Sequence, residues 1–218
     1  AVVLIGYSLL ICLFVAPDAP DGSDPLSVTG NIAGWVDRQW LPGTFACGSF
    51  DPEGLLSTLP AIVSALFGMF TGEFLLRKRS SLSGEQIALC MALAAVAITV
   101  IGIIWNCWIP INKKLWSSSF TCVVTGYSLG LFALFYYLID VRGWKRWTFF
   151  FRVIGLNSIT IYLAQRIVGF GGIANFFFGG AASHCPEAIA RVISNAGYVA
   201  ICWLFLYFLY RKSTFLKV

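Results

Sequence analysis

The sequence predicts an all-α membrane protein, a polytopic bundle of about six transmembrane helices. Hydrophobic residues make up 58% of the 218 residues, charged residues make up only 11%, and the mean hydropathy is +0.80. Soluble domains contain about 25% charged residues. A bilayer core about 30 Å thick requires roughly 20 apolar helical residues. Six stretches approach this requirement, at approximately residues 2–16, 55–76, 87–108, 115–139, 149–168 and 188–210.

The first stretch is short and begins at residue 1 without a methionine. No basic segment precedes its apolar residues and no small-residue cleavage site follows them, so we interpret it as a truncated span and not as a signal peptide. We therefore expect residues 1–218 to form a single transmembrane domain that is the C-terminal part of a larger bundle.

The basic residues predict the orientation of the chain. Ten of the fifteen Lys and Arg residues follow the second, fourth and sixth spans, and so share one side of the membrane. The positive-inside rule predicts that this side, and with it the C-terminus, is cytoplasmic. The opposite side carries the loop 18–54, which holds six of the ten acidic residues. The net charge of +5 is thus an orientation signal and does not indicate nucleic-acid binding. The ten basic residues are Arg77, Lys78, Arg79, Arg142, Lys145, Arg146, Arg152, Arg211, Lys212 and Lys217.

The seven Cys residues and the single His, His184, show no zinc-binding spacing, because the sequence contains no C-x-x-C pair. We expect no metal. Most of the Cys residues lie within spans as small apolar residues. Cys47 and Cys185 fall in loops on the non-cytoplasmic side, where they either form a disulfide in an oxidising compartment or stay free.

The loop 18–54 is longer than a simple connector and contains the segment NIAGWVDRQWLPG. Its Trp35, Val36 and Trp40 have helical spacing, and Pro42 with Gly43 closes the segment. This pattern predicts either a short interfacial helix or an aromatic anchor at the membrane surface.

The second span follows the motif Asp51, Pro52, Glu53. Asp51 fits a helix N-cap, Pro52 fits the first helical position, and the charge of Glu53 suits the positive end of a helix dipole. We predict that the helix begins here and that Pro60 bends it one to two turns later.

Small residues recur at four-residue intervals in two spans. Ser64, Gly68 and Gly72 form one stripe in the second span, while Gly126 and Gly130 form another in the fourth. Such stripes let neighbouring helices approach closely, so we predict two packing seams. Because few residues separate the third and fourth spans, we also expect these two spans to be antiparallel neighbours.

The fifth span carries a polar stripe. Ser158, Tyr162, Gln165 and Arg166 share one helical face, and Asn157 directly precedes them. Polar groups inside a bilayer usually face a bundle interior or an aqueous cavity, so we interpret this stripe as cavity-lining. Arg166 alone could instead reach the membrane surface from the end of the span. The Gly- and Phe-rich segment after this span forms either a re-entrant or a membrane-surface loop.

Alternating spans place several polar groups near the non-cytoplasmic boundary. They include the carboxylates that open the second span, the polar loop that precedes the fourth, the end of the fifth span and the histidine beyond it. We hypothesise that they line a polar vestibule for a polar substrate, although six helix ends at an interface would also gather charges. The residues concerned are Asp37, Arg38, Asp51, Glu53, Asn112, Lys113, Lys114, Gln165, Arg166 and His184.

Several ordered sequence blocks make the chain resemble the heparan-α-glucosaminide N-acetyltransferase family, whose bacterial relatives are often labelled N-acetylglucosamine-related membrane proteins or transporters. The resemblance covers essentially the whole chain. The blocks are GNIAGWVDRQWLPG, FDPEGLLSTLPAIVSALFGMFTGEFL, PINKKLWSSSFTCVVTGYSL, YYLIDVRGW, GLNSITIYL and YFLYRKSTFLKV.

The resemblance implies a transmembrane enzyme that passes acetyl from acetyl-CoA to the amine of a glucosamine-type amino sugar. The family's catalytic His lies in an N-terminal half that is absent here, and His184 does not match its motif. The resemblance therefore implies a chain that needs this missing half and is inactive alone. Candidate substrate or acetyl-CoA contacts within the matched blocks are Asp51, Glu53, Asn112, Lys113, Trp116 and Asn157. Tyr162, Gln165 and Arg166 join them from the polar stripe.

A secondary transporter for N-acetylglucosamine or a related sugar is the alternative function. Transporters often contain inverted repeats with broken helices, and this sequence shows no clear internal repeat. The expected partners are the lipid bilayer, the amino-sugar substrate and the missing N-terminal half, with a homo-oligomer left open. The expected location is the bacterial inner membrane.

Overall fold

The computed structural model describes residues 2–45 and 47–216, so Lys217 of the basic set lies outside the described residues. The chain divides into two compact units, residues 1–143 and 144–218, and each unit is described by itself. Over the described residues the regular secondary structure is helical, with one isolated bridge between Val15 and Asn31. The prediction of an all-α membrane protein is confirmed.

Among the described residues, four helices are long and apolar enough to cross a membrane. They are α3 (Thr58–Lys78), α4 (Gly84–Trp105), α5 (Ser118–Tyr136) with its π-helical continuation η1 (Tyr137–Val141), and α9 (Glu187–Arg211). The pair α7 (Ser158–Ile167) and α8 (Phe170–Ser183), bent by 81°, gives a fifth candidate span if it is counted as one. We predicted about six spans. Two predicted spans account for the difference. Helix α1 (Val2–Leu13) has 12 residues, fewer than the roughly 20 that a span requires, and residues 149–168 do not form one continuous helix.

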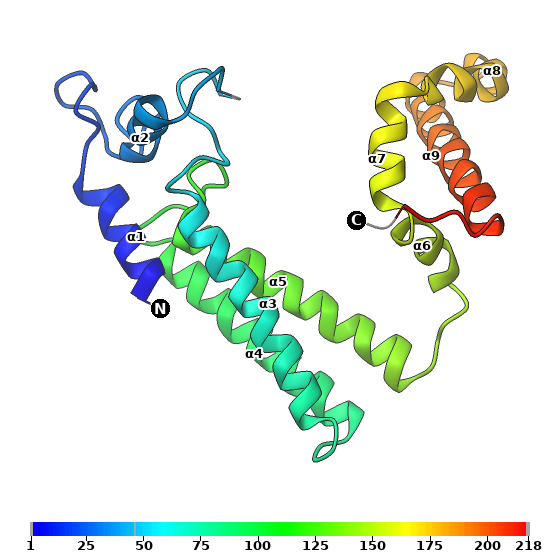
Figure 1. The fold of residues 1–218 in the computed structure, drawn as a ribbon, viewed down its shortest axis with the longest axis horizontal. Helices are drawn as coiled ribbons and strands as arrows, with labels where there is room; N and C mark the ends of the chain where they lie inside the picture. Colours follow the sequence, from blue (N-terminus) through cyan, green and yellow to red (C-terminus); the bar gives the residue numbers. More distant parts are fainter. Residues whose placement is uncertain (1, 46, 217–218) are drawn as a thin grey trace. The chain divides into compact units, whose positions relative to one another are not determined.

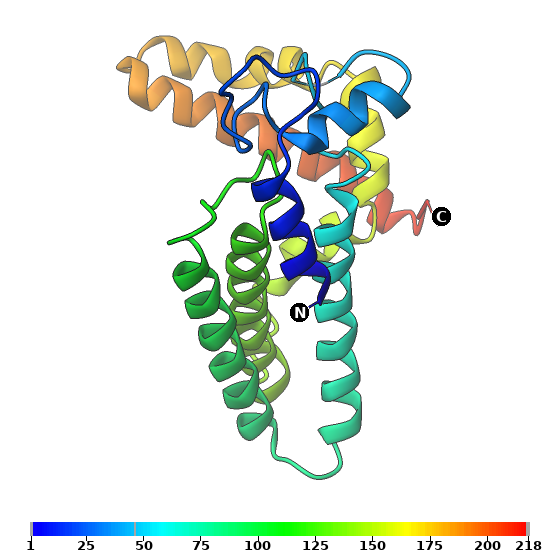
Figure 2. The same cartoon turned by 90° about the vertical axis from the view of Figure 1, so that its left-hand side faces the viewer.

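In the first unit, α4 and α5 lie side by side and antiparallel, as predicted, and α3 lies alongside α5 (Figures 1 and 2). Side-chain caps fix where α4 and α5 begin. Ser83 and Gln86 form a capping box at the start of α4, in which each side chain accepts the other residue's backbone N–H. Ser117 caps α5 through its hydroxyl oxygen, which accepts the N–H of Phe120.

The predicted seam at Gly126 is confirmed. A Cβ on Gly126 would lie 2.2 Å from Thr99 Oγ1 and 2.8 Å from the carbonyl oxygen of Ala95. Gly102 of α4 also approaches α5 closely, because its Cβ would lie 2.7 Å from a Val123 methyl group. Glycines on both helices thus let the backbones of α4 and α5 pack directly against each other.

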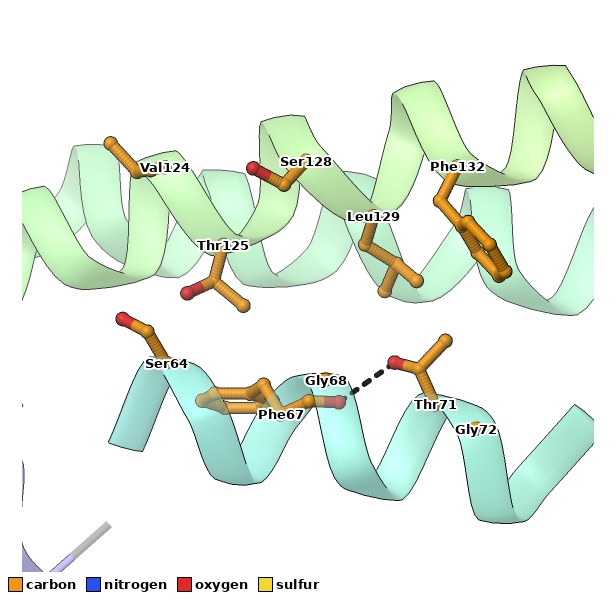
Figure 3. A pocket seen from close by; sticks show the side chains of 10 residues that line it. All are labelled: Ser64, Phe67, Gly68, Thr71, Gly72, Val124, Thr125, Ser128, Leu129 and Phe132. Carbon is orange, nitrogen blue, oxygen red and sulfur yellow. Dashed lines mark hydrogen bonds between the residues drawn. The ribbon is translucent and has the colours of Figure 1, made fainter. Parts of the chain in front are cut away.

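The second predicted seam, at Ser64, Gly68 and Gly72, is wrong. A Cβ on either glycine would meet no atom within 4 Å. The stripe instead lines a cavity of about 410 Å³ between α3 and α5, which Figure 3 shows from close by. Phe67 and Phe132 are the two aromatic side chains among the residues that line this groove.

The second span does not begin at Asp51, which corrects the predicted N-cap. Helix α3 begins at Thr58, and residues 51–57 form consecutive turns. The Asp51 carboxylate accepts the N–H of Glu53 at 2.9 Å, an Asx-type turn that competes with helix formation. Pro60 falls in the first turn of α3, where proline is tolerated because that N–H would have no intrahelical partner.

The second unit contains α6 (Thr148–Gly155), α7, α8 and α9 (Figure 1). Helices α8 and α9 pack closely, since a Cβ on Gly197 of α9 would lie 2.5 Å from the Phe178 ring of α8. Helix α6 is held to α9 by Trp203, whose indole stacks on Phe150 with ring centroids 5.6 Å apart and donates a hydrogen bond to the Phe150 carbonyl at 3.2 Å.

The helix predicted over 149–168 is divided into α6 and α7, which corrects the continuous fifth span. Asn157 stands at the break with φ −133° and ψ 33°. Its buried side chain donates to the Thr214 carbonyl and accepts from the Thr160 hydroxyl, each at 3.3 Å. These bonds favour a non-helical backbone at Asn157 over a continued helix.

Candidate functional site

The loop 18–54 folds around α2 (Ile32–Trp40), so the helix that the spacing predicts is present. Its place at a membrane surface and an anchoring role for its Trp side chains stay predictions. Asn31, which is 1% exposed, caps this helix by accepting the N–H of Gly34. Its amide group donates to the carbonyls of Ser27 and Val28, at 3.1 and 2.9 Å. One buried side chain thus fixes both the start of α2 and the turn that precedes it.

Arg38 of α2 holds two distant parts of the loop. Its guanidinium binds Asp18 in a bidentate pair at 2.8 and 2.9 Å and donates to the Ser49 carbonyl at 2.7 Å. The hydrogen bond and the charge of Arg38 lower the pKa of the Asp18 carboxyl below its ordinary value. This planar fork suits Arg and would not be reproduced by Lys.

Acidification is expected to release this pair. Because the folded pKa of Asp18 lies below its unfolded value, its contribution to loop stability is complete above the unfolded pKa, about 3.9, and is lost as the pH falls through the folded pKa. We expect hydrogen exchange of residues 15–20, corrected for intrinsic rates, to accelerate below about pH 4. In Asp18→Asn we expect fast exchange of these residues at every pH. If the variant showed the same pH dependence as the wild type, the prediction would be wrong.

Asp37 lies on the inner face of α2 and is 1% exposed. Its carboxylate accepts the N–H of Leu55 at 3.0 Å and, more weakly, the N–H of Asp51 at 3.4 Å. Gly54 passes directly over the carboxylate, since a Cβ there would lie 2.2 Å from it. Asp37 therefore fastens the turn 51–55 to α2.

This turn presents the two predicted carboxylates differently. Glu53 is exposed at the apex, whereas Asp51 is half-buried and uses one oxygen to accept the N–H of Glu53. Phe50, 4% exposed, anchors the chain just before the turn against Gly34 of α2. Glu53 is consequently the freer of the two groups for binding a ligand.

The loop between α4 and α5 presents Lys113 and Lys114 to solvent. Asn112 shapes this loop, because its side-chain oxygen accepts the N–H of Lys114 at 2.9 Å and that of Leu115 at 3.4 Å. Trp116 has the uncommon φ of +50°, and its ring meets Phe120 edge-on at 5.7 Å. Its indole Nε1 is buried without a hydrogen-bond partner among the described residues.

The turn 51–55 and the loop 106–117 lie at the same end of the first unit (Figure 1). Tyr7 and Ile11 of α1 form a buried cluster with Ile109 of this loop, and Leu56 packs against the cluster. The Tyr7 hydroxyl also donates to the Leu115 carbonyl at 2.6 Å. The structure thus brings Asp51, Glu53, Asn112, Lys113 and Trp116 to one end.

The opposite end of this unit is basic. Arg77, Lys78 and Arg79 end α3, and Arg142 follows η1, where Val141 lies next to Gly84. Arg142 stacks over the Tyr137 ring with its guanidinium carbon 5.2 Å from the ring centroid. Within the first unit, the predicted separation of acidic loop and basic ends is therefore observed.

The remaining candidates belong to the second unit. Tyr162, Gln165 and Arg166 are exposed on α7, a helix without a buried residue, while Asn157 is buried and bound to protein partners. His184 ends α8, with Nδ1 2.7 Å from the Gly180 carbonyl oxygen of its own helix. A vestibule that joins these residues to the first unit stays a prediction.

The sequence left open a disulfide between two loop cysteines. Cys47 belongs to the first unit and Cys185 to the second, and both are free in the structure. Within the described residues, no group of three or more His, Cys, Asp or Glu side chains could hold a metal ion.

The sequence placed Asp37 and Arg38 near this boundary but did not predict that their side chains hold the loop together. The signal was present: a charged pair inside the helical segment NIAGWVDRQW, next to aromatic residues, is costly to bury without specific partners. The partners themselves lie 11 to 20 residues away along the chain, and local patterns do not identify them.

The long apolar helices define the chain as an all-α integral membrane protein. The chain is similar to heparan-alpha-glucosaminide N-acetyltransferase of Mus musculus, with 28% identity over 212 residues that cover 87% of this chain and 31% of that protein. The Homo sapiens protein of the same name matches with the same identity and 30% of its length.

The resemblance stated from the sequence is confirmed by these two relatives, and the chain spans about 31% of their length. No protein-family model matches the chain. Both relatives carry the name of a transferase, so the alternative transporter function gains no support.

Proposed function

We propose that this chain contributes the acceptor end of a transmembrane N-acetyltransferase that moves acetyl from acetyl-CoA to the amine of a glucosamine-type sugar. The observation that carries the proposal is the similarity to two proteins named heparan-alpha-glucosaminide N-acetyltransferase across 87% of this chain. The charged end of the first unit supports it, because an amino sugar is cationic and hydroxyl-rich and needs anionic and hydrogen-bonding partners.

The reaction requires a neutral amine. The amine nitrogen attacks the thioester carbonyl, the C–N bond forms, the C–S bond breaks, and CoA leaves as a thiol after taking up a proton. The sugar ammonium must lose a proton first, so an acceptor carboxylate near it promotes attack. Glu53 fits this role better than Asp51, because Glu53 is exposed and Asp51 is occupied in its turn.

Acetyl-CoA fits the other charged loop. Lys113 and Lys114 are exposed cations on a loop ordered by Asn112, and CoA phosphates are anions that such side chains bind. Trp116 offers an unpartnered indole N–H at the base of this loop. The polar face of α7, with Tyr162, Gln165 and Arg166, is a further candidate contact surface.

The proposed location is the bacterial inner membrane with a cytoplasmic C-terminus, and a homo-oligomer stays open. The acidic end of the first unit would then face away from the cytoplasm, as the positive-inside rule predicts from the basic residues at the opposite end. The family's catalytic His is expected from the N-terminal half of the same protein.

The test is acetyl transfer from labelled acetyl-CoA to glucosamine by the full-length protein in proteoliposomes. In Glu53→Gln we expect kcat/KM for the sugar to fall about tenfold, because a neutral amide neither pairs with an ammonium nor accepts its proton at neutral pH. Glu85→Gln is the matched control, since Glu85 is exposed in the first turn of α4 at the opposite end. Sugar uptake without acetylation would overturn the proposal.

A further inference from the structure

Asp37 is a buried carboxylate without a cation. It is 1% exposed, and no described Lys or Arg side chain forms an ion pair with it. The adjacent Arg38 is engaged with Asp18 and Ser49. An ionised group in such surroundings is costly to bury unless backbone donors satisfy it, so its partners indicate what it does.

The partners of Asp37 are the two ends of a single turn. One carboxylate oxygen accepts the N–H of Leu55 at 3.0 Å and the other lies 3.4 Å from the amide nitrogen of Asp51. Between these amides the Gly54 backbone is in contact with the carboxylate, a position that only a residue without a side chain can take. The apex residue, Glu53, is left exposed.

Several contacts fix the helix beneath the turn and the chain that leads into it. Helix α2 is capped by Asn31, its Gly34 faces Phe50, and Arg38 fixes the Ser49 carbonyl. The turn is therefore held on α2 both before residue 51 and at residue 55. Asp37 supplies the attachment nearest to the apex.

We propose that Asp37 is a positioning residue that sets the placement of the Glu53 carboxylate for the amino-sugar substrate. This inference rests on the proposed function, in which Glu53 meets the sugar amine. Asp37 itself has no access to substrate, because it lies beneath the turn. Its effect passes through the backbone of residues 51–55.

The first test measures the attachment without any activity. In the full-length protein, Asp37→Asn is expected to accelerate hydrogen exchange of the Asp51 and Leu55 amides about tenfold, because an amide oxygen is a weaker acceptor than a carboxylate. Gly54→Ala should do the same from the other side of the contact. Asp24→Asn is the matched control, since Asp24 also accepts a backbone N–H, that of Leu26, in an exposed turn of the same loop. Unchanged exchange at residues 51 and 55 would overturn the inference.

The second test separates positioning from folding. We expect Asp37→Asn to raise KM for glucosamine about tenfold, with KM for acetyl-CoA unchanged, whereas a merely structural role would lower the amount of active enzyme and leave both KM values unchanged. In a Glu53→Gln background the same substitution should add less than about twofold, because the two residues act through one carboxylate. Full additivity would overturn the inference. A wild-type protein that shows no acetyl transfer would overturn the proposed function alone, because the exchange measurement still tests the attachment.

Discussion

Gly126→Ala is expected to destabilise the first unit by about 1–3 kcal/mol, the usual cost of overpacking a filled interface. The added methyl would lie 2.2 Å from Thr99 Oγ1, and the Thr99 hydroxyl is held by a 2.8 Å bond to the Ala95 carbonyl. Since the Ala95 carbonyl would itself lie 2.8 Å from the methyl, relief requires α4 and α5 to move apart.

Two glycines provide matched controls for this prediction. A Cβ on Gly130 would lie 3.6 Å from the Ala95 Cβ, an ordinary contact, and a Cβ on Gly68 would meet open space. The free energy of unfolding of both alanine variants should lie within about 0.5 kcal/mol of the wild-type value. The measurement is thermal or denaturant unfolding in detergent, followed by circular dichroism. Equal midpoints for the Gly126 and Gly68 variants would show that the α4–α5 seam is not the close contact described.

Asn157→Ala is expected to destabilise the second unit by about 1–3 kcal/mol and to release the segment after α9. Asn157 is 2% exposed, and it joins the α6–α7 break to the Thr214 carbonyl, 57 residues further along the chain. Without the side-chain amide, the Thr214 carbonyl loses this donor. The hydrogen bonds that favour a non-helical backbone at residue 157 are lost as well.

Limited proteolysis near Arg211 and Lys212 measures the release, and thermal unfolding measures the loss of stability. Asn195→Ala is the control, because Asn195 is an exposed residue within α9. We expect faster cleavage in the Asn157 variant only. If both variants were cleaved at the wild-type rate, Asn157 would not hold the C-terminal segment. That result would favour a ligand-binding role for its side chain.

Features that depend on neighbouring residues were predictable. Apolar length gave the membrane class, the short polar loop gave the antiparallel pairing of α4 and α5, and the spacing of Gly126 gave their close approach. Each follows from a helix repeat or from loop closure, which operate within a few turns of chain.

Features that depend on contacts between residues far apart in the sequence could not be predicted. Asp51 has the identity of a helix cap, yet its side chain closes a turn and α3 starts at Thr58. The stripe of Gly68 and Gly72 has the spacing of a packing seam, yet it lines a groove, and a Cβ on either glycine would meet no atom within 4 Å. A small-residue pattern permits close approach without enforcing it.

The sequence by itself determined that this chain is an all-α membrane protein with opposite charge at the two ends of its first unit. The hydropathy and the charge of a segment depend only on the residues in that segment, so they can be read without the fold. Only the tertiary structure decided which carboxylate is free and which is buried. Asp37 binds backbone amides on both sides of Glu53, which is exposed at the apex of the turn. The hydrogen bond from the Leu55 N–H to Asp37 joins a turn to a helix residue 18 positions earlier in the chain. Hydrogen bonds of this kind depend on three-dimensional proximity, which no local pattern encodes.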